Sequence, residues 1–316
     1  KATKATKATK ATKATKATKA TKATKATKSR VAKSAPGAAF EVSSPERIVY
    51  PDAKLTKADV AAYYAAVAPW LLPELAGRPL SLLRCPDGTA GTCFFQKHHA
   101  PAFGPAVHAI PLRESDGQDD YLYVRDVDGV LALVQMNAIE FHPWGARVDR
   151  PEQPDRLVFD LDPDEGIAWR DIQAAARDVR DRLAEVGLRS WVRLSGGKGL
   201  HVVVPIRRGP TWAQAKAFCE AFADAMVAHA PLTYVATASK ARRKDRIFID
   251  WLRNARGATS VANWSLRARP GAPVVMPLRW DLVRMPVWRV RPCWTARKCC
   301  ASWSRSRRAT ASAPAA

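Results

Sequence analysis

Apolar residues dominate one short segment around which the rest of the chain is organised, Leu157–Asp162, and they alternate with acids over its second half. Its apolar residues include Val158 and Phe159, types that favour β-strands. Because successive side chains of a strand point to opposite faces, Asp160 and Asp162 share one face. The pattern therefore predicts a largely buried strand that presents two carboxylates on one side.

Two helices and a hairpin are predicted after this strand. Apolar residues recur at steps of four, three, four and three, as on one face of an amphipathic helix, at Ile172, Ala176, Val179, Leu183 and Val186. Thr211-Trp-Ala-Gln214 is a capping box that opens a second helix to about His229. Strands are predicted over 189–194, 200–206 and 246–252. The order strand, helix, hairpin, helix, strand indicates an α+β domain of layered sheets and helices.

The part of the chain before residue 157 predicts one helix and several strands. Thr56-Lys-Ala-Asp59 is typical of a helix N-terminus and opens a helix through about Leu72. The predicted strands cover residues 81–84, 92–96, 121–124 and 130–135.

The positive charge of the chain is concentrated at its two ends. The formal net charge is +22, but residues 1–33 hold twelve of the 51 basic residues and residues 282–316 hold eight, with no acid in either segment. Residues 34–281 therefore carry 31 bases against 29 acids. Binding of phosphate by this central part would depend on local clusters of basic side chains rather than on a global field.

Composition also predicts the domain organisation. Residues 1–27 are Lys-Ala-Thr repeated nine times and have no hydrophobic face, so we expect a disordered linker over 1–36. A catalytic domain is predicted over 37–281. Residues 282–316 form an atypical basic tail, for which a change of reading frame in the source DNA is one hypothesis and a natural basic tail the alternative. The chain starts with Lys1 rather than Met, as a piece of a longer protein would.

Compartment and cysteine chemistry follow from what the sequence lacks. No apolar run reaches membrane-spanning length and no secretory h-region opens the chain, so we expect a cytoplasmic protein. Among the six cysteines there is no Cys-x-x-Cys pair, and three lie in the basic tail. The spacing supports neither a zinc site nor a disulfide framework.

The paired carboxylates of Asp160 and Asp162 are candidates for metal binding. Two acids on one face of a rigid strand repel each other unless a cation lies between them, and oxygen ligands suit Mg²⁺ or Mn²⁺. The alternative is a strand end with two solvated acids. An EF-hand is excluded because Pro163 interrupts the loop and Glu165 stands where glycine is required.

A glycine-rich segment between two predicted strands is a candidate phosphate site. Ser195-Gly-Gly-Lys-Gly199 can turn its N–H groups inward as an anion nest, while Ser195 adds a hydroxyl and Lys198 adds a charge. His201 lies on the strand that leaves the loop. No Ser or Thr follows the lysine and a strand follows the loop, which excludes a P-loop. A plain hairpin turn is the alternative.

Further candidates lie on other segments. Asp250 shares a strand face with Phe248 and Leu252, so we expect it to point into an apolar layer, where a metal or Arg253 would satisfy it. A purely structural pair of Asp250 with Arg253 is the alternative.

Basic and aromatic residues complete the set. Arg267 and Arg269 alternate on an extended piece and could grip phosphate oxygens, the alternative being a solvated edge. Phe94-Phe95-Gln-Lys97 joins aromatic rings to a base, which suits stacking on a nucleobase, although buried core aromatics are the alternative.

Taken together, these motifs resemble the polymerase domain of bacterial ATP-dependent DNA ligase D, in the archaeo-eukaryotic primase superfamily, over roughly Pro45 to Asp281. The motifs that carry the resemblance are Asp160-Leu-Asp162-Pro-Asp164-Glu, Ser195-Gly-Gly-Lys-Gly-Leu-His201, Ile249-Asp250-Trp-Leu-Arg253-Asn, Arg78-Pro-Leu, Arg84-Cys-Pro-Asp-Gly88, Phe95-Gln-Lys97 and Ser265-Leu-Arg267-Ala-Arg. The resemblance implies a primase-like fold with mixed and antiparallel sheets flanked by helices. It also implies a metal-dependent nucleotidyltransferase that extends DNA ends and fills gaps, often with ribonucleotides, in non-homologous end joining.

The resemblance also implies roles for individual residues. The metal ligands would be Asp160, Asp162 and Asp250, holding two Mn²⁺ or Mg²⁺ ions. The incoming NTP or dNTP would be bound by Ser195, His201, Arg253 and Arg267. The DNA contacts would be Arg47 and Lys57 at the 5′-phosphate of a gap, Phe94 and Phe95 on the template side, and His142 near the primer end.

The implied partners are DNA ends and gaps that bear a 5′-phosphate, the protein Ku, and ligase and phosphoesterase domains on a longer chain. The implied place is the bacterial nucleoid, with no membrane partner. Two other functions stay open from the sequence: a stand-alone primase, and a catalytically inactive protein that binds DNA ends.

Overall fold

The structure is a computed structural model, and it describes residues 42–114 and 117–284. The predicted linker over 1–36 and nearly all of the predicted tail over 282–316 lie outside the described residues. The predicted domain boundaries stay predictions.

Helix α1 (Lys57–Leu75) begins where the sequence predicts it. The Thr56 hydroxyl accepts a hydrogen bond from the backbone N–H of Asp59, and the Asp59 carboxylate accepts one from the backbone N–H of Thr56 at 2.8 Å. This reciprocal capping satisfies two donors that a helix N-terminus otherwise leaves free. The helix continues beyond its predicted end and includes Pro69 and Pro73.

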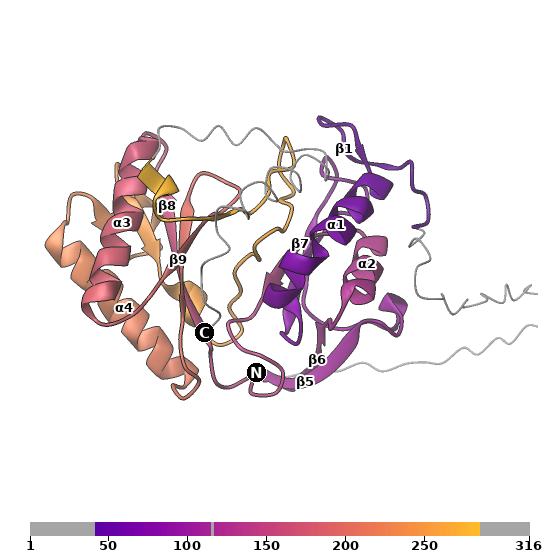
Figure 1. The fold of residues 1–316 in the computed structure, drawn as a ribbon, viewed down its shortest axis with the longest axis horizontal. Coiled ribbons are helices and arrows are strands. Elements are labelled where there is room, and N and C mark those ends of the chain that lie inside the picture. The colour runs from indigo at the N-terminus through magenta and orange to yellow at the C-terminus, as the bar shows by residue number, and fades with distance from the viewer. Residues whose placement is uncertain (1–41, 115–116, 285–316) are drawn as a thin grey trace, which may run out of the picture. The chain divides into compact units, whose positions relative to one another are not determined.

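A three-stranded antiparallel sheet packs against this helix. Its strands, in spatial order, are β4 (Phe94–Gln96), β3 (Leu80–Arg84) and β7 (Ala138–Pro143). Helix α1 and helix α2 (Val127–Gln135) both contact β7, and Figure 1 shows them next to it. Strands β3 and β4 confirm two predictions, whereas β7 was not assigned from the sequence.

The predicted strand over 130–135 is wrong, because these residues belong to α2. The Asp126 side chain caps this helix by accepting a hydrogen bond from the backbone N–H of Gly129 at 3.0 Å. The buried residues are spaced as on one helix face, at Val130, Leu131, Leu133 and Val134. Cap and spacing outweigh the strand preference of the two valines.

Two further pairs of strands belong to this half of the chain. Strand β5 (His108–Glu114) and strand β6 (Gly117–Tyr123) form an antiparallel hairpin, and β6 contains most of the strand predicted over 121–124. Strand β1 (Ile48–Tyr50) pairs with strand β2 (Leu55–Thr56) just before α1.

Cys85 and Cys93 form a disulfide, although the spacing of the cysteines in the sequence did not support a disulfide framework. They bound the segment that joins β3 to β4, and the antiparallel pairing of the strands brings their Cα atoms to 4.3 Å. The third cysteine in the described residues, Cys219, is buried and free. Pairing here follows from the fold rather than from a recognisable cysteine spacing.

A six-stranded sheet forms the other half of the structure. Its strands, in spatial order, are β11 (Tyr234–Val235), β12 (Ile247–Asp250), β8 (Arg156–Pro163), β10 (Leu200–Pro205), β9 (Trp191–Leu194) and β13 (Pro277–Leu278). All neighbours are antiparallel except β11 and β12. The strand that carries the two predicted carboxylates, β8, therefore lies inside the sheet with a neighbour on each side.

Helix α3 (Trp169–Glu185) and helix α4 (Trp212–His229) contact this sheet, and Figure 1 shows both beside β8 and β9. Their apolar side chains share a buried cluster with Phe159 and Leu161 of β8, which are both fully buried. Val186 is the exception to the predicted helix face, because it follows the last residue of α3 as its C-cap and is 59 % exposed. The helices thus cover the apolar face of β8 and leave the face with the carboxylates for other contacts.

These layers place the described residues in the α+β class, as predicted. Within the ranges 42–114 and 117–284, no helix combines the length and the apolar character needed to cross a bilayer.

Candidate active site

Four side chains form a row across four neighbouring strands, which we call the polar row: Arg193, His201, Asp160 and Asp250. Asp160 of β8 is paired with His201 of β10 on one side and with Asp250 of β12 on the other. Arg193 of β9 is paired with His201. His201 Nε2 lies 3.3 Å from Asp160 Oδ1, and Arg193 Nε donates a hydrogen bond to His201 Nδ1 at 3.1 Å. Strand register therefore brings four distant segments of the sequence to one line.

Asp162 lies two residues beyond Asp160 on the same face, as the alternation predicts. Phe159 and Leu161 point to the opposite face, into the core under the helices. The guanidinium of Arg243 donates to Asp162 Oδ2 at 3.1 Å, and the Asp162 side chain is 45 % exposed. The second carboxylate of the motif thus lies at the edge of the polar row and is open to solvent.

Arg253 connects the carboxylates of two strands. Its Nε lies 2.9 Å from Asp250 Oδ2 and 3.9 Å from Asp160 Oδ2. Because one guanidinium nitrogen is within reach of both carboxylates, Asp160 and Asp250 converge on one part of the sheet. Asp250 is also fixed by its own backbone, since Oδ1 accepts from the N–H of Leu252 at 3.0 Å.

The predicted apolar surroundings of Asp250 are wrong. Phe248 is buried on the same strand face, but Leu252 lies in a 3₁₀ turn (Leu252–Asn254) and is 38 % exposed. Strand β12 ends at Asp250, so the alternation that would place Leu252 beside it no longer applies. Asp250 instead lies among charged groups, with Arg253 on one side and Asp160 on the other.

The charges in the polar row shift the pKa values of its two acids in opposite directions. Burial opposes ionisation of Asp160, but His201 and Arg253 outweigh burial and lower its pKa. Burial raises the pKa of Asp250, and the negative charge of Asp160 adds to this effect against the opposing charge of Arg253. Burial is also the largest reason why the pKa of His201 is lowered, which favours its neutral form.

This arrangement fits a divalent cation. Asp160 and Asp250 face each other, and the negative charge of Asp160 disfavours ionisation of Asp250. A cation between the two carboxylates would offset this repulsion. Asp160, Asp162 and Asp250 offer the oxygen ligands that Mg²⁺ and Mn²⁺ prefer. Two arginines, Arg243 and Arg253, now neutralise these carboxylates.

The glycine-rich loop lies next to the polar row because β10 starts from it. An added Cβ at Gly199 would lie 2.1 Å from the carbonyl oxygen of Leu161, so only glycine allows β10 to approach β8 this closely. The Ser195 hydroxyl donates to Gly199 O at 3.0 Å and accepts from the N–H of Gly197 at 3.2 Å. Ser195 therefore closes the loop upon itself, and it uses one of the N–H groups predicted to form the anion nest.

Lys198 is exposed on the outer side of this loop. It lines a cavity of about 650 Å³ together with Gly196, Gly197, Asp164 and Glu165. The loop thus has one side on the polar row and one on an open cavity.

Arg267 and Arg269 both reach the glycine-rich loop. Arg267 donates to the carbonyl oxygen of Ser195 and lies against Gly196, where an added Cβ would be 2.6 Å from Arg267 Cγ. Arg269 Nη1 lies 3.1 Å from the corresponding position on Gly197. The interpretation as a solvated edge is therefore excluded for Arg267, whereas Arg269 is exposed.

A buried carboxylate links Arg267 to His142. Glu140 Oε2 lies 2.9 Å from Arg267 Nε and 2.9 Å from His142 Nε2. Burial opposes ionisation of Glu140, but its contacts with His142 and Arg267 lower its pKa. His142 in turn lies edge-on to the ring of Phe95, with 5.3 Å between ring centroids.

Phe94 and Phe95 are exposed on β4, at 43 % and 64 % of their full surface. The interpretation of these rings as core aromatics is therefore excluded. Arg84 lies over the Phe94 ring at 5.4 Å from its centroid. Lys97 points elsewhere: its amine binds both oxygens of Glu114, at 2.6 and 2.8 Å.

Arg47 and Lys57 are neighbours, as a shared anion site requires. The backbone N–H of Lys57 donates to Arg47 O at 2.8 Å. The Lys57 side chain is buried, and its amine donates to the carbonyl oxygen of Ser43 at 3.0 Å. Burial, reinforced by the charge of Arg47, lowers the pKa of Lys57. The Arg47 guanidinium donates to the side chain of Asn137.

Sequence reasoning missed several members of the site: Arg193, Arg243, Glu140 and Ser260. Arg193 is a charged residue inside an otherwise apolar strand, two positions before Ser195, and this position was the available signal. Ser260 accepts a hydrogen bond from Arg193 Nη2 at 2.7 Å and lies 3.3 Å from His201 Nδ1. It comes from an irregular segment whose placement the sequence pattern does not indicate.

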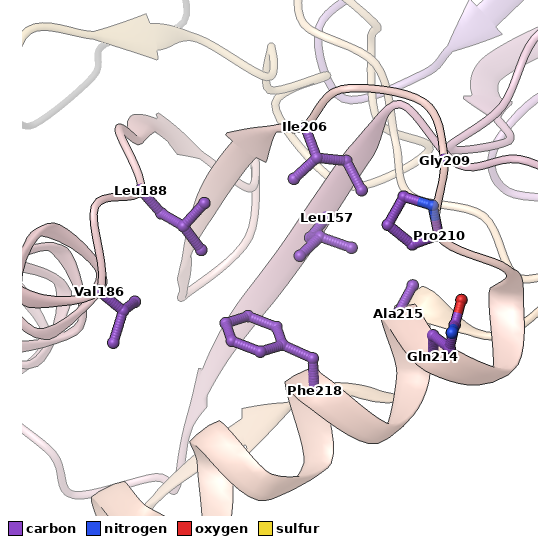
Figure 2. A pocket seen from close by; sticks show the side chains of 9 residues that line it. All are labelled: Leu157, Val186, Leu188, Ile206, Gly209, Pro210, Gln214, Ala215 and Phe218. Carbon is purple, nitrogen blue, oxygen red and sulfur yellow. The ribbon is translucent and has the colours of Figure 1, made fainter.

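Two other features of the described residues lie outside the polar row. His98, Glu114 and Asp119 are close enough to share a metal ion, although Lys97 already neutralises Glu114. An apolar cavity of about 650 Å³ lies on the helix-covered face of the sheet, between Leu157 and Phe218 (Figure 2). Gln214 is the one polar side chain among the residues that line it, and none of them is charged.

Comparison with known proteins gives consistent matches. A family model described as "LigD, primase-polymerase domain" matches residues 56–306, and so it includes residues 282–306, which the sequence resemblance left out. The chain is 38 % identical over 247 residues to the multifunctional non-homologous end joining protein LigD of Pseudomonas aeruginosa, covering 78 % of this chain and 29 % of that protein. It is 27 % identical over 249 residues to the bifunctional LigD of Bacillus subtilis, covering 77 % of this chain and 39 % of that protein. The chain therefore spans roughly a third of the length of these relatives.

A solved structure, the polymerase domain of Mycobacterium tuberculosis ligase D in complex with DNA, superposes with a TM-score of 0.78 at 28 % identity. The match covers 87 % of this chain and 99 % of that one. The predicted primase-like α+β fold is thereby confirmed.

Proposed function

The chain belongs to the LigD primase-polymerase family, and on this premise we propose that it is a DNA-end-directed nucleotidyltransferase of non-homologous end joining. It extends the 3′ end of a strand at a double-strand break and fills gaps, with a preference for ribonucleotides. The observation that carries the proposal is the polar row, in which His201, Asp160 and Asp250 are in direct register beside the glycine-rich loop.

Asp160, Asp162 and Asp250 are the residues that would hold the divalent cations, Mn²⁺ or Mg²⁺, in a two-metal site. The chemistry supplied by such cations is activation of the 3′-hydroxyl of the strand and neutralisation of the triphosphate charge. Burial and the negative charge of Asp160 raise the pKa of Asp250. A cation held by both carboxylates would offset these effects, and this supports the assignment.

The side chains around the polar row bind and orient the nucleotide. His201 receives hydrogen bonds at Nδ1 and therefore carries its proton on Nε2, so it donates toward Asp160 and toward any phosphate oxygen placed there. Arg267, Ser195 and Lys198 lie on or against the glycine-rich loop and stabilise the charge of the triphosphate. Arg253 is 46 % exposed, so it is open to ligand as well as to the carboxylates.

DNA contacts are proposed for residues outside the six-stranded sheet. Phe94 and Phe95 present exposed rings on which template bases stack, and His142 lies behind Phe95 near the primer end. Arg47 and Lys57 bind the 5′-phosphate across a gap, for which their adjacent positions and the depressed pKa of Lys57 are support. Lys97, held by Glu114, has the weakest structural support among these residues.

Partners follow from the same proposal. DNA ends and gaps with a 5′-phosphate are the substrates, and Ku recruits the protein to breaks in the bacterial nucleoid. Ligase and phosphoesterase domains would lie on a longer chain, since this chain spans roughly a third of its relatives.

Incorporation of a ribonucleotide opposite a short gap with a 5′-phosphate tests the proposal, with the parent chain and Asp160→Ala side by side. We expect metal-dependent addition by the parent and its loss in the variant. Synthesis on unprimed single strands would favour a primase, and DNA binding without synthesis by the parent would favour an inactive end-binding protein.

A further inference from the structure

A polar cavity of about 710 Å³ lies on the same sheet face as the polar row. Its lining includes Val203 of β10 and Trp191 of β9, which pair with each other two residues beyond the pair of His201 and Arg193. It also includes Arg156 of β8, which is four residues from Asp160 and therefore on the same face. The cavity thus continues the polar row toward the far ends of these strands.

Basic side chains dominate the charge of this cavity. Five arginines line it: Arg78, Arg156, Arg189, Arg193 and Arg207. The acidic side chains of the lining are Glu74 and Asp155. The excess of positive charge in a concave site favours an anionic ligand.

Both carboxylates are already occupied by two of these arginines. Arg78 binds Asp155 through two parallel hydrogen bonds of 2.7 Å, and Arg156 binds Glu74 at 2.8 Å. Two further arginines of the cavity, Arg189 and Arg207, are both exposed. Neither of them forms an ion pair with another residue that the structure describes.

A buried donor also lacks a full set of partners. Arg193 is 2 % exposed, and its Nη1 has no hydrogen-bond partner among the residues that the structure describes. The nearest acid, Glu74, is 3.9 Å away. Burial lowers the pKa of Arg193 to about 10, against the opposing charge of Glu74. A buried guanidinium with an unused N–H is a group that an anion would stabilise.

We propose that this cavity binds the sugar-phosphate backbone of the DNA strand whose 3′ end lies at the polar row, an inference that rests on the proposed function. A strand rises about 3.3 Å per residue, so Arg156 lies roughly 13 Å from Asp160. A stacked DNA strand carries one phosphate per 3.4 Å or so, and this span therefore holds about four nucleotides. Trp191, 52 % exposed among these arginines, offers a ring for a base of the same strand.

The test is fluorescence anisotropy of a labelled DNA with a single-stranded 3′ overhang, titrated with the full chain at several salt concentrations. The variants are Arg189→Ala, Arg207→Ala and the two combined, which remove exposed charges without disturbing the polar row. The combined variant should bind about tenfold more weakly at low salt, and its salt slope should fall by about 1.4, which corresponds to two lost single-strand phosphate contacts.

Arg182→Ala is the matched control for each single variant, because it also removes one charge, from α3 on the covered face of the sheet, where Arg182 pairs with Asp178 at 3.2 Å. The control should bind like the parent. Equal affinity and equal salt slope for the parent and the combined variant would overturn the proposal. So would a drop no larger than that of the control.

Inorganic pyrophosphate distinguishes the two sources of phosphate. Competition by micromolar pyrophosphate that disappears in the combined variant would assign the cavity to a free polyphosphate and reject the DNA strand. The assay measures binding alone, so weaker binding by the combined variant would support DNA binding in the cavity even if the parent added no nucleotide. If the parent is active and the combined variant binds DNA equally well, only the proposal about the cavity would be rejected.

Discussion

Replacement of Gly199 by alanine should damage both the stability and the activity of this protein. The new Cβ would lie 2.1 Å from the Leu161 carbonyl oxygen and 3.2 Å from its carbonyl carbon, so β8 and β10 would have to separate by about 1 Å. Neither partner moves easily, because Leu161 is paired with Leu200 in the sheet and Gly199 O accepts hydrogen bonds from Ser195. The separation would fall directly beside the register of His201 with Asp160.

The expected size of the effect follows from packing energetics. Forced insertion of a methyl group into a packed region costs roughly 1–3 kcal/mol, and the rigid surroundings place Gly199→Ala at about 3 kcal/mol. For a domain of this size that corresponds to a fall in Tm of about 6–12 °C. A displacement of about 1 Å at reacting groups lowers activity by roughly a hundredfold.

Urea unfolding and nucleotide incorporation would measure the two effects. Gly166→Ala is the matched control, since an added Cβ there meets no atom within 4 Å. A Gly199→Ala variant with the stability and activity of the Gly166→Ala control would refute the close approach of the two strands.

Three other predictions test separate parts of the structure. Reduction of the disulfide between Cys85 and Cys93, eight residues apart, should lower the free energy of unfolding of the parent by about 2–3 kcal/mol. The same treatment should leave a Cys85→Ser/Cys93→Ser variant unchanged, and equal losses in both proteins would contradict the pairing. Arg47→Ala and Lys57→Ala should weaken binding to gaps with a 5′-phosphate more than to gaps with a 5′-hydroxyl, and equal losses on both would argue against phosphate recognition. Hydrogen bonds from Lys97, Tyr121 and His98 lower the pKa of Glu114 from 4.5 to about 2, so its stabilising effect is complete above pH 4.5 and is lost as the pH falls toward 2. Urea midpoints of the parent should therefore fall more than those of Glu114→Gln between pH 6 and pH 3, and parallel curves would refute this assignment.

The local patterns around β8 predict the centre of the site well. Alternation alone places Asp160 and Asp162 on one face and Phe159 and Leu161 on the other, because a two-residue period is a property of the strand itself. Capping signals likewise place the starts of α1 and α4, since a cap is made by residues close in sequence.

Features that depend on long-range pairing could not be predicted in this way. The direct pairing of Asp250 with Asp160 follows from the order of strands in the sheet, and the local pattern instead predicted an apolar layer around Asp250. The disulfide of Cys85 depends on how β3 pairs with β4. For residues 130–135, runs of valine and leucine fit a strand as well as a helix, and the Asp126 cap decided the outcome.

Binding of Mn²⁺, measured by electron paramagnetic resonance with the parent and Asp250→Asn, tests most directly whether acids from separate strands form one cation site. Asp178→Asn, on α3 beside Arg182, is the control. We predict that the parent and the control bind Mn²⁺ with equal affinity and that Asp250→Asn binds it at least tenfold more weakly. Equal Mn²⁺ affinity in Asp250→Asn and the parent would contradict the account.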